Sequence, residues 1–403
     1  MGSEDQSDRR VRVAKARIAV VSPFVDKRHG TERCLAEEIE WLARDYEIHL
    51  FSSRVEDTNL SGIAWHRVPE MPGPHLVKYL FWFAANHFWR WKESRRGGRP
   101  FDLIYSPGIN CLDADVILVH HLFAEQLARV GEELRLQPER PWTWLRLIHR
   151  RLYYETLRAL EKKVYSDRTV CLAAISRTMA NDLVRGFRSG EQIPAIYYGV
   201  DVVRFDPAEC RERRKAARNR FGFRPEEAVV LLIGNDWAKK GLNCLIEALA
   251  ETRDLPVRAL VVGRDARESY ESRAAALGIA ERLSFADVSA DVIEFFAAAD
   301  LYAAPSVYDP FGLPVLEAMA CGLPVIASAA MGASELVTDA VNGRILHDPR
   351  DKTALSAMIR QLATDVTLRN RLGSKAAETA RKFSWEANAE AIERLFVRAL
   401  AND

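Results

Sequence analysis

The sequence predicts an α/β protein that is built from two parallel-sheet domains. Short apolar, β-branched runs alternate with helical patterns along most of the chain, a rhythm that is typical of parallel strands joined by helical crossovers. The pattern starts again after residue 200, and 403 residues are enough for two or three domains. We therefore expect ligands to bind beyond the carboxyl ends of the strands, in the cleft that separates the two domains.

The first half contains five predicted strands and two clear helices. Helical spacing of apolar residues over 31–46 predicts the first crossover, and a long charged helix is expected over residues 144–167. The strands are expected at residues 17–24, 47–53, 101–108, 115–121 and 169–176.

The second half repeats the pattern with six predicted strands. They are expected at residues 228–236, 258–265, 282–288, 300–306, 323–328 and 343–347. Helices are expected over 241–252, up to Leu277, and from points near Asp291, Gly312 and Ser334.

Composition shifts and turn residues predict where the domains begin and end. Glycine, proline and aspartate interrupt regular structure near residues 198–207. The expected order is a disordered tail at 1–16, an N-terminal domain at 17–198, a C-terminal domain at 199–382 and an amphipathic helix at 383–403 that crosses back to the first domain.

Composition excludes several classes of protein. The formal net charge of +1 argues against a general nucleic-acid binder. Six scattered cysteines without a C-x-x-C pair predict reduced thiols and no zinc site. The polar N-terminus lacks the apolar core of a secretory signal, and no run of eighteen apolar residues occurs, so we expect a cytoplasmic protein.

Residues 300–328 are the most informative segment for function. A strand is followed by the loop YDPFG and by a helix that Gly312 opens. Unpaired amides at such a helix start suit a diphosphate, and Asp309 and Glu317 lie at positions from which they can contact a ligand. Helix capping and a solvated helix face explain the two carboxylates equally well from spacing alone.

The segment DPFGLPVLEAMACGLPV (309–325) resembles the signature of retaining GT-B glycosyltransferases of the large family four. The resemblance implies that Glu317 holds the ribose of a nucleotide-sugar, that Asp309 contacts the donor sugar, and that Phe311, Gly312 and Leu313 cradle the donor. The first acidic residue of the pattern is usually glutamate. The shorter Asp309 therefore bears on donor choice.

The segment GNDWAKKG (234–241) resembles the diphosphate loop of the same family. Lys240 takes the place of the family lysine, which neutralises charge on the leaving diphosphate. Asn235 replaces the family arginine, and Lys239 is a candidate to compensate for the lost charge. The competing explanation for both lysines is a solvated helix start.

Three further segments resemble the family pattern in its usual order. Residues 198–207 resemble the start of the second domain, and 334–343 resemble its later motifs. Residues 282–288 resemble the strand and loop that receive the nucleobase, which makes Val288 a donor-binding candidate.

The N-terminal half carries two weaker signals. PFVDKRHGTE (23–32) resembles a glycine-rich loop in which Gly30 remains and His29 replaces a second glycine. His120, with His121 as the second choice, ends a predicted strand where family members often have a histidine near the reacting carbon. A core or capping histidine is the alternative.

Residues 75–99 combine seven aromatic with six basic side chains, and residues 141–163 repeat the mixture. One interpretation is a buried core helix with charged flanks. The other is peripheral docking on an anionic membrane, where aromatic rings favour the interface and cations attract headgroups. Docking suits a glycan or lipid-linked acceptor, and the arrangement is similar to lipopolysaccharide core glucosyltransferases.

Together these features predict a retaining glycosyltransferase with His120, Asp309 and Lys240 as catalytic residues. The expected donor is a nucleotide-sugar, by default UDP-glucose, and the acceptor a membrane-associated glycan or lipid such as lipopolysaccharide core. The resemblance implies a reaction without an essential metal, so we expect no metal or other cofactor. A nucleotide-sugar epimerase or hydrolase and a non-catalytic nucleotide-sugar-binding protein are the alternatives.

Overall fold

The computed structural model describes residues 15–27, 30–96, 99–123, 141–289 and 291–401. The predicted tail at 1–16 falls outside this part of the chain except for Lys15 and Ala16, and His29 also lies outside it. The chain forms two compact units. Unit 1 comprises residues 1–117, 122–171 and 393–403, and unit 2 comprises 118–121 and 172–392.

Six strands form the first sheet, in the order β5-β3-β1-β6-β7-β8. The strands are β1 (Arg17–Val21), β3 (Glu47–Ser52), β5 (Ile63–Arg67), β6 (Leu103–Pro107), β7 (Val116–Val119) and β8 (Cys171–Ala174). β1 pairs in parallel with β3 and β6, and β3 pairs in parallel with β5. Every residue of β1 is buried, as is typical of a strand covered on both faces. A short two-stranded sheet joins β2 (Phe24–Val25) to β4 (Arg54–Val55).

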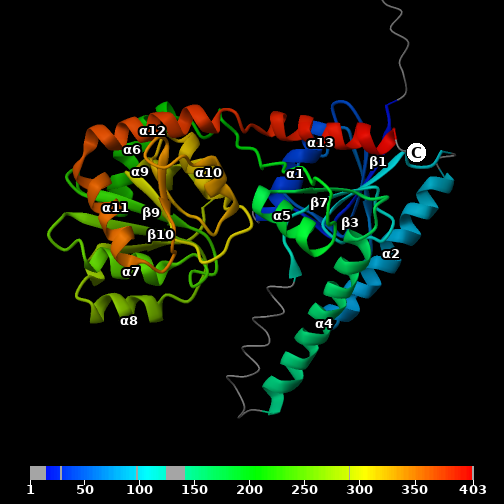
Figure 1. Cartoon of the computed structure of the whole chain (residues 1–403), viewed down its shortest axis with the longest axis horizontal. Coiled ribbons are helices and arrows are strands. Elements are labelled where there is room, and N and C mark those ends of the chain that lie inside the picture. Colours follow the sequence, from blue (N-terminus) through cyan, green and yellow to red (C-terminus); the bar gives the residue numbers. More distant parts are fainter. Residues whose placement is uncertain (1–14, 28–29, 97–98, 124–140, 290, 402–403) are drawn as a thin grey trace, which may run out of the picture. The chain divides into compact units, whose positions relative to one another are not determined.

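Three long helices belong to unit 1: α1 (Gly30–Leu42), α2 (His75–Arg96) and α4 (Pro141–Tyr165). Figure 1 shows α2 and α4 running side by side, and the rings of Tyr79 and Tyr153 meet between them at 5.9 Å. The C-terminal half of α13 (Trp385–Leu400) also packs in unit 1. There the ring of Phe396 contacts those of Tyr46 and Tyr105 at 5.6 and 5.4 Å.

The second sheet lies in unit 2 and is parallel throughout, in the order β11-β10-β9-β12-β13-β14. Its strands are β9 (Ala228–Ile233), β10 (Val257–Val262), β11 (Leu283–Ala286), β12 (Leu301–Ala304), β13 (Val325–Ser328) and β14 (Gly343–Leu346).

Helices cover both faces of the second sheet (Figure 1). They are α6 (Pro207–Phe221), α7 (Leu242–Ala250), α8 (Glu268–Ala276), α9 (Ile293–Ala298), α10 (Leu313–Ala320), α11 (Lys352–Thr364) and α12 (Val366–Ala380), with 3-10 turns η1 (Ala280–Arg282) and η2 (Gly332–Leu336). The helix α5 (Arg177–Gly186) follows β8. A core of aliphatic side chains with Trp237 holds α7, α8 and α11 against β9 and β10.

The predicted α/β class with two parallel sheets is confirmed, and all eleven predicted strands are present. β5 was not predicted. The helix expected near Ser334 is only the 3-10 turn η2. The predicted boundary at residue 198 stays a prediction, because the sheets and the compact units divide the chain at different places.

Candidate functional site

The loops that carry the predicted chemistry follow two neighbouring strands of the second sheet. Asn235 and Lys240 come after β9, and Asp309 and Gly312 come after β12. The carboxyl ends of adjacent parallel strands meet at one edge of a sheet, which is where ligands of open α/β sheets bind. The fold therefore brings together the two motifs that the sequence separates by about seventy residues.

An ion pair joins these two loops. Lys240 Nζ lies 2.5 Å from Asp309 Oδ2, and the two side chains are only 21% and 11% exposed. Asp309 Oδ1 also accepts a hydrogen bond from the backbone N–H of Phe311 at 3.3 Å. The lysine and the aspartate that were predicted independently thus form one partly buried charged unit.

Two glycines make room for this unit. Gly234 has φ of 149°, and a Cβ there would lie 2.7 Å from Lys240 Cε. Gly312 has φ of 91° at the start of α10, and a Cβ there would lie 2.2 Å from Met331 Cε. The positive φ at both positions favours glycine, and a side chain there would have to displace the flexible end of Lys240 or Met331. The glycines of both motifs therefore have a structural reason in this chain.

Glu317 lies in the second turn of α10 and is 4% exposed. It is close enough to Tyr302 to affect its ionisation: burial first, then the charges of Asp309 and Glu317, raises the pKa of the Tyr302 hydroxyl. That hydroxyl donates to the carbonyl of Ile233 at 3.3 Å. Both predicted carboxylates therefore lie near Tyr302, at the carboxyl edge of the second sheet.

A small hollow at this edge contains residues that the sequence did not identify. Its lining includes Tyr302, Ser306 and Met331 beside Lys240 and Asp309. Ser306 is 1% exposed, and its Oγ has no hydrogen-bond partner among the described residues. The hollow is too narrow for a water molecule, so a ligand would have to widen it to reach this hydroxyl.

The side chains of Asn235 and Lys239 make different contacts from that of Lys240. Asn235 Oδ1 accepts from the backbone N–H of Arg264 at 2.9 Å, so this side chain ties the loop after β9 to the loop after β10. Lys239 Nζ lies 5.1 Å from the ring centre of Tyr308. Neither contact restores the cation that the arginine would have supplied, although Arg264 is exposed beside Asn235.

His120 is 2% exposed and directly follows β7. Its Nδ1 is hydrogen bonded to the hydroxyl of Tyr198, whose ring in turn lies 4.8 Å from that of Phe311. Burial, and then the neighbouring His121, lowers the pKa of His120 to about 3. Burial and the charge of Lys239 lower the pKa of His121 to about 4. Both imidazoles are therefore neutral at physiological pH, and His120 is linked to the predicted loop through Tyr198.

Three further predicted donor-binding residues are Gly30, Val288 and Leu313. Gly30 starts α1 in unit 1, and a Cβ there would meet no atom within 4 Å. Val288 is 42% exposed in the loop after β11. Leu313, in contrast, is the first residue of α10 and is almost buried. Among the described residues of unit 2, no hydrogen bond or ion pair connects Val288 with the Lys240–Asp309 pair.

Glu335 is a residue whose role the sequence did not reveal. Its carboxylate accepts from the backbone N–H groups of Arg177 and Thr178 at 2.8 Å and from the Tyr197 hydroxyl at 2.9 Å. Burial alone would raise its pKa, but these hydrogen bonds outweigh burial and lower it. Glu335 therefore anchors η2 to the start of α5 next to the predicted site.

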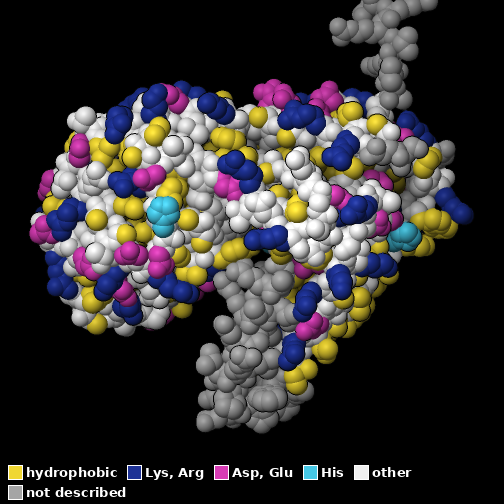
Figure 2. All heavy atoms as spheres, in the orientation of Figure 1, with side chains coloured by type: hydrophobic (Ala, Val, Ile, Leu, Met, Phe, Trp, Pro, Cys, Tyr) yellow, Lys and Arg dark blue, Asp and Glu magenta, His cyan; other side chains and the backbone are white. Residues whose placement is uncertain are grey.

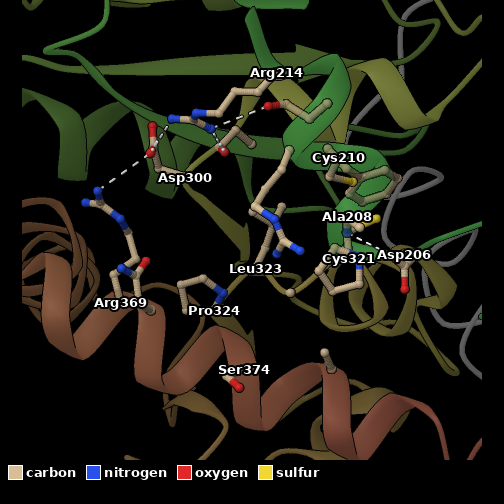
Figure 3. Close-up of a pocket in the computed structure, with 18 of the residues that line it drawn as sticks. Asp206, Ala208, Cys210, Arg214, Asp300, Cys321, Leu323, Pro324, Arg369 and Ser374 are labelled. Atoms are coloured by element: carbon tan, nitrogen blue, oxygen red, sulfur yellow. Dashed lines mark hydrogen bonds and ion pairs between the residues drawn. The ribbon is translucent and has the colours of Figure 1, made fainter.

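A larger cavity, of about 860 Å³, lies elsewhere in unit 2. It is lined by Asp300 and Pro324, which directly precede β12 and β13 and so mark the amino ends of the strands. Figure 3 shows Arg214 and Arg369 pointing toward Asp300, and Arg214 Nη2 donates to Asp300 Oδ1 at 2.8 Å. We place the functional site at the opposite edge, because ligands of open parallel sheets bind beyond the carboxyl ends of the strands.

Comparison with known proteins identifies the second half of the chain. Residues 213–379 match the family described as Glycosyl transferases group 1. A D-inositol 3-phosphate glycosyltransferase of Corynebacterium efficiens is 29% identical over 326 residues, which cover 76% of this chain and 73% of that protein. The protein of the same name from Mycobacterium marinum is 34% identical over 229 residues, which cover 52% of this chain and only 46% of that protein.

Solved structures extend the likeness to nearly the whole chain. WaaG, described as a glycosyltransferase involved in lipopolysaccharide biosynthesis, has a TM-score of 0.74 at 21% identity and covers 93% of this chain and 98% of its own. Anabaena HepE, solved in complex with UDP-glucose, has a TM-score of 0.67 at 21% identity and covers 95% of this chain and 99% of its own. At these identities the likeness shows the fold, two Rossmann-like domains of the GT-B type.

Proposed function

Because this chain is a glycosyltransferase of the glycosyl transferases group 1, we propose that it transfers a sugar from a nucleoside diphosphate sugar to an acceptor hydroxyl. The observation that carries the proposal is the Lys240–Asp309 ion pair beside the left-handed Gly312. These groups supply a cation, a carboxylate and a helix start at one edge of a parallel sheet.

Donor binding would exchange the partners of this ion pair. An arriving diphosphate attracts the Lys240 ammonium and the backbone amides at the start of α10. Asp309, released from Lys240, then accepts hydrogen bonds from hydroxyls of the donor sugar. Glu317 accepts from the ribose hydroxyls, and the hydroxyl of Ser306 gains a partner in the same hollow.

The proposed reaction retains the configuration at the anomeric carbon. The bond from that carbon to the diphosphate oxygen breaks, and the acceptor oxygen attacks from the same face. The acceptor proton passes to the departing diphosphate, so no enzymic base is consumed. Lys240 and the α10 amides stabilise the negative charge that develops on the leaving group.

His120 fits a positioning role toward the donor sugar or the acceptor. It is neutral, and its Nδ1 is held by Tyr198. Its Nε2 has no hydrogen-bond partner among the described residues. A fixed, neutral imidazole can offer that nitrogen to a sugar hydroxyl without adding a positive charge.

We propose UDP-glucose as the donor and a membrane-associated glycan or lipid as the acceptor. The UDP-glucose complex of HepE, which shares the fold, supports the donor. The acceptor finds support in the fold it shares with WaaG and in the outer surface of α2, along which hydrophobic side chains are visible in Figure 2. The names of the curated relatives make inositol 3-phosphate the competing acceptor.

Contact with the membrane is proposed to be peripheral, at a cytoplasmic surface. Among the described residues, no helix combines the length and apolarity that a bilayer span requires. On α2 only Trp82, Asn86 and Arg90 are buried, whereas Phe88 and Trp91 are about half exposed. The interpretation of residues 75–99 as a buried core helix is therefore wrong for much of this helix.

The test separates donor binding from turnover in matched variants. Lys240→Met and Glu317→Gln remove the proposed phosphate and ribose contacts, and Lys352→Met serves as a control on the exposed start of α11. We expect UDP binding, measured by calorimetry, to weaken by about tenfold or more in both site variants and to be unchanged in the control. Unchanged binding and activity in both site variants would sink the assignment.

Product analysis distinguishes the remaining alternatives. The wild-type chain is incubated with UDP-glucose alone, with inositol 3-phosphate, or with extracted envelope lipids. A sugar-acceptor product with retained configuration supports transfer. Rapid conversion of the donor without an acceptor would instead identify an epimerase or hydrolase, and binding without any product would identify a non-catalytic protein.

A further inference from the structure

Unit 1 contains a cluster of histidine and carboxylate side chains that the proposed reaction does not use. His49 lies on β3, His66 on the neighbouring β5, and Glu93 on α2. Each offers one ligand atom, and these atoms lie within 4.8 Å of one another. Because His66 is paired with Phe51, two residues along β3 from His49, both imidazoles project from the same face of the sheet.

The outer nitrogens of the two rings have polar partners. His49 Nε2 is 2.8 Å from Glu47 Oε1 and 3.2 Å from Arg17 Nη2. The carboxylate can only accept and the guanidinium can only donate, so Nε2 has a partner in either tautomer of His49. On the other ring, His66 Nδ1 faces Glu93 Oε2 at 3.7 Å.

The inner nitrogens of the two rings face each other. His49 Nδ1 and His66 Nε2 are 2.9 Å apart. A proton between them makes an N–H···N hydrogen bond, and a metal ion that displaces this proton would be bound by both lone pairs. A carboxylate that orients a ligating histidine through its far nitrogen is the usual outer-shell arrangement of protein metal sites.

We propose that His49, His66 and Glu93 form a binding site for Zn²⁺, with a water molecule as the fourth ligand. Two imidazoles and one carboxylate are a donor set that zinc accepts readily, and His49 is already 94% buried. The site is independent of the proposed transferase reaction, because none of its residues belongs to the donor-binding edge in unit 2.

The two imidazole nitrogens need only a small adjustment, and the Glu93 carboxylate must approach from within 4.8 Å of them. Zinc–nitrogen bonds of about 2.0–2.1 Å in a tetrahedron place the two nitrogens about 3.3 Å apart, about 0.4 Å more than here. His66 and Glu93 are partly exposed, with side chains 20% and 26% accessible, so they can move by that amount. The Arg17 guanidinium, 3.2 Å from His49 Nε2, lies on the far side of the ring from the proposed ion.

A metal ion here would fasten α2 to the first sheet. Glu93 is near the C-terminal end of α2, and the two histidines come from the strands β3 and β5 at one edge of the sheet. Metal binding would therefore stabilise the edge strand and hold the helix whose outer face carries Phe88 and Trp91.

The test uses the full chain without an affinity tag, stripped with a chelator and dialysed. Zinc binding is measured by calorimetry, and Co²⁺ absorption reports the ligand type and geometry. We expect one equivalent of zinc at micromolar concentration, a rise in Tm with zinc, and a cobalt spectrum without thiolate bands. His66→Gln and Glu93→Gln should each weaken zinc binding by about tenfold or more.

His87→Gln is the matched control, because His87 lies on the same helix and is exposed beside Asp113. It should bind zinc as the wild type does. Because Glu93 is partly exposed, the Glu93→Gln variant should keep the Tm of the metal-free wild type. An unchanged Tm would show that weaker zinc binding by this variant does not result from misfolding. Zinc affinity unchanged in both site variants, or no binding by the folded wild type at micromolar zinc, would overturn the proposal.

Discussion

The geometry of the proposed donor site depends on the absence of a side chain at Gly312. Its φ of 91° lies in the left-handed region, and the position where a Cβ would stand is 2.2 Å from Met331 Cε and 3.4 Å from Asp309 Oδ2. The turn is thus closed around the carboxylate that pairs with Lys240. A side chain at this residue must move Met331, Asp309 or the start of α10.

We predict that Gly312→Ala impairs donor binding far more than it impairs folding. The left-handed conformation costs about 1–2 kcal/mol for alanine. The flexible end of Met331 can yield, but the displaced turn misaligns the α10 amides and Asp309. UDP-glucose affinity measured by calorimetry should therefore fall by about tenfold, which corresponds to about 1.4 kcal/mol, with Tm lowered by only a few degrees.

Gly222→Ala is the control for this prediction. Gly222 is left-handed too, with φ of 68°, but it ends α6, and a Cβ there would meet no atom within 4 Å. This variant should show a similar loss of Tm and normal donor affinity. If the two variants bind the donor equally well, the turn at Gly312 has no part in donor binding.

The sequence predicted the identities of the site residues better than their partners. Lys240 and Asp309 stood in separate motifs, and nothing in their spacing indicated an ion pair. Tyr198 and Ser306 were missed as site residues because their contacts depend on which strand ends become neighbours. Glu335 was part of a matched motif, yet its hydrogen bonds to the start of α5 required the folded chain.

At the scale of elements, prediction succeeded where burial is uniform. β1 and β9 are apolar along nearly their whole length and were easy to identify. β5 was missed because only Ile63 of its five residues is buried, so an edge strand left no continuous apolar run. The helix expected near Ser334 is a 3-10 turn, since the segment from Gly332 makes only one tight turn before β14.

The helix α2 carries the second prediction. Phe88→Ser combined with Trp91→Ser should reduce binding to vesicles that contain anionic lipid by about fivefold or more, because these exposed rings supply apolar area at the interface. Arg95 lies 4.4 Å from the ring centre of Trp91, so cation and aromatic ring approach the headgroups together. Co-sedimentation with vesicles measures the effect, and turnover of a water-soluble acceptor should not change.

Val203→Ser is the control for vesicle binding. Val203 is 85% exposed and belongs to unit 2, whereas α2 belongs to unit 1. Its variant should bind vesicles as the wild type does, and high salt should weaken wild-type binding because headgroup attraction is screened. Equal vesicle binding by the double variant and the wild type would remove α2 from the docking surface.

At the scale of the whole molecule, the two units contain buried groups that respond to pH in opposite directions. In unit 1, burial raises the pKa of Glu38 to about 8, although the Tyr105 hydroxyl donates to it at 3.0 Å, and burial raises the pKa of Glu161 to about 7. In unit 2, burial lowers the pKa values of His120 and His121 to about 3 and 4.

The last prediction follows from the sign of these shifts. Folded unit 1 binds more protons than its unfolded state between about pH 4.5 and 8, so its stability falls as the pH rises through that window. Folded unit 2 binds fewer protons than its unfolded state below about pH 6.5, so its stability falls on acidification. Each group contributes at most about 1.4 kcal/mol per pH unit.

Limited proteolysis with mass spectrometry should therefore find the first cleavages in unit 1 at pH 8.5 and in unit 2 at pH 5. Glu38→Gln should diminish the alkaline loss alone, and His120→Asn the acid loss alone. Cleavage that begins in the same unit at both pH values would contradict this assignment.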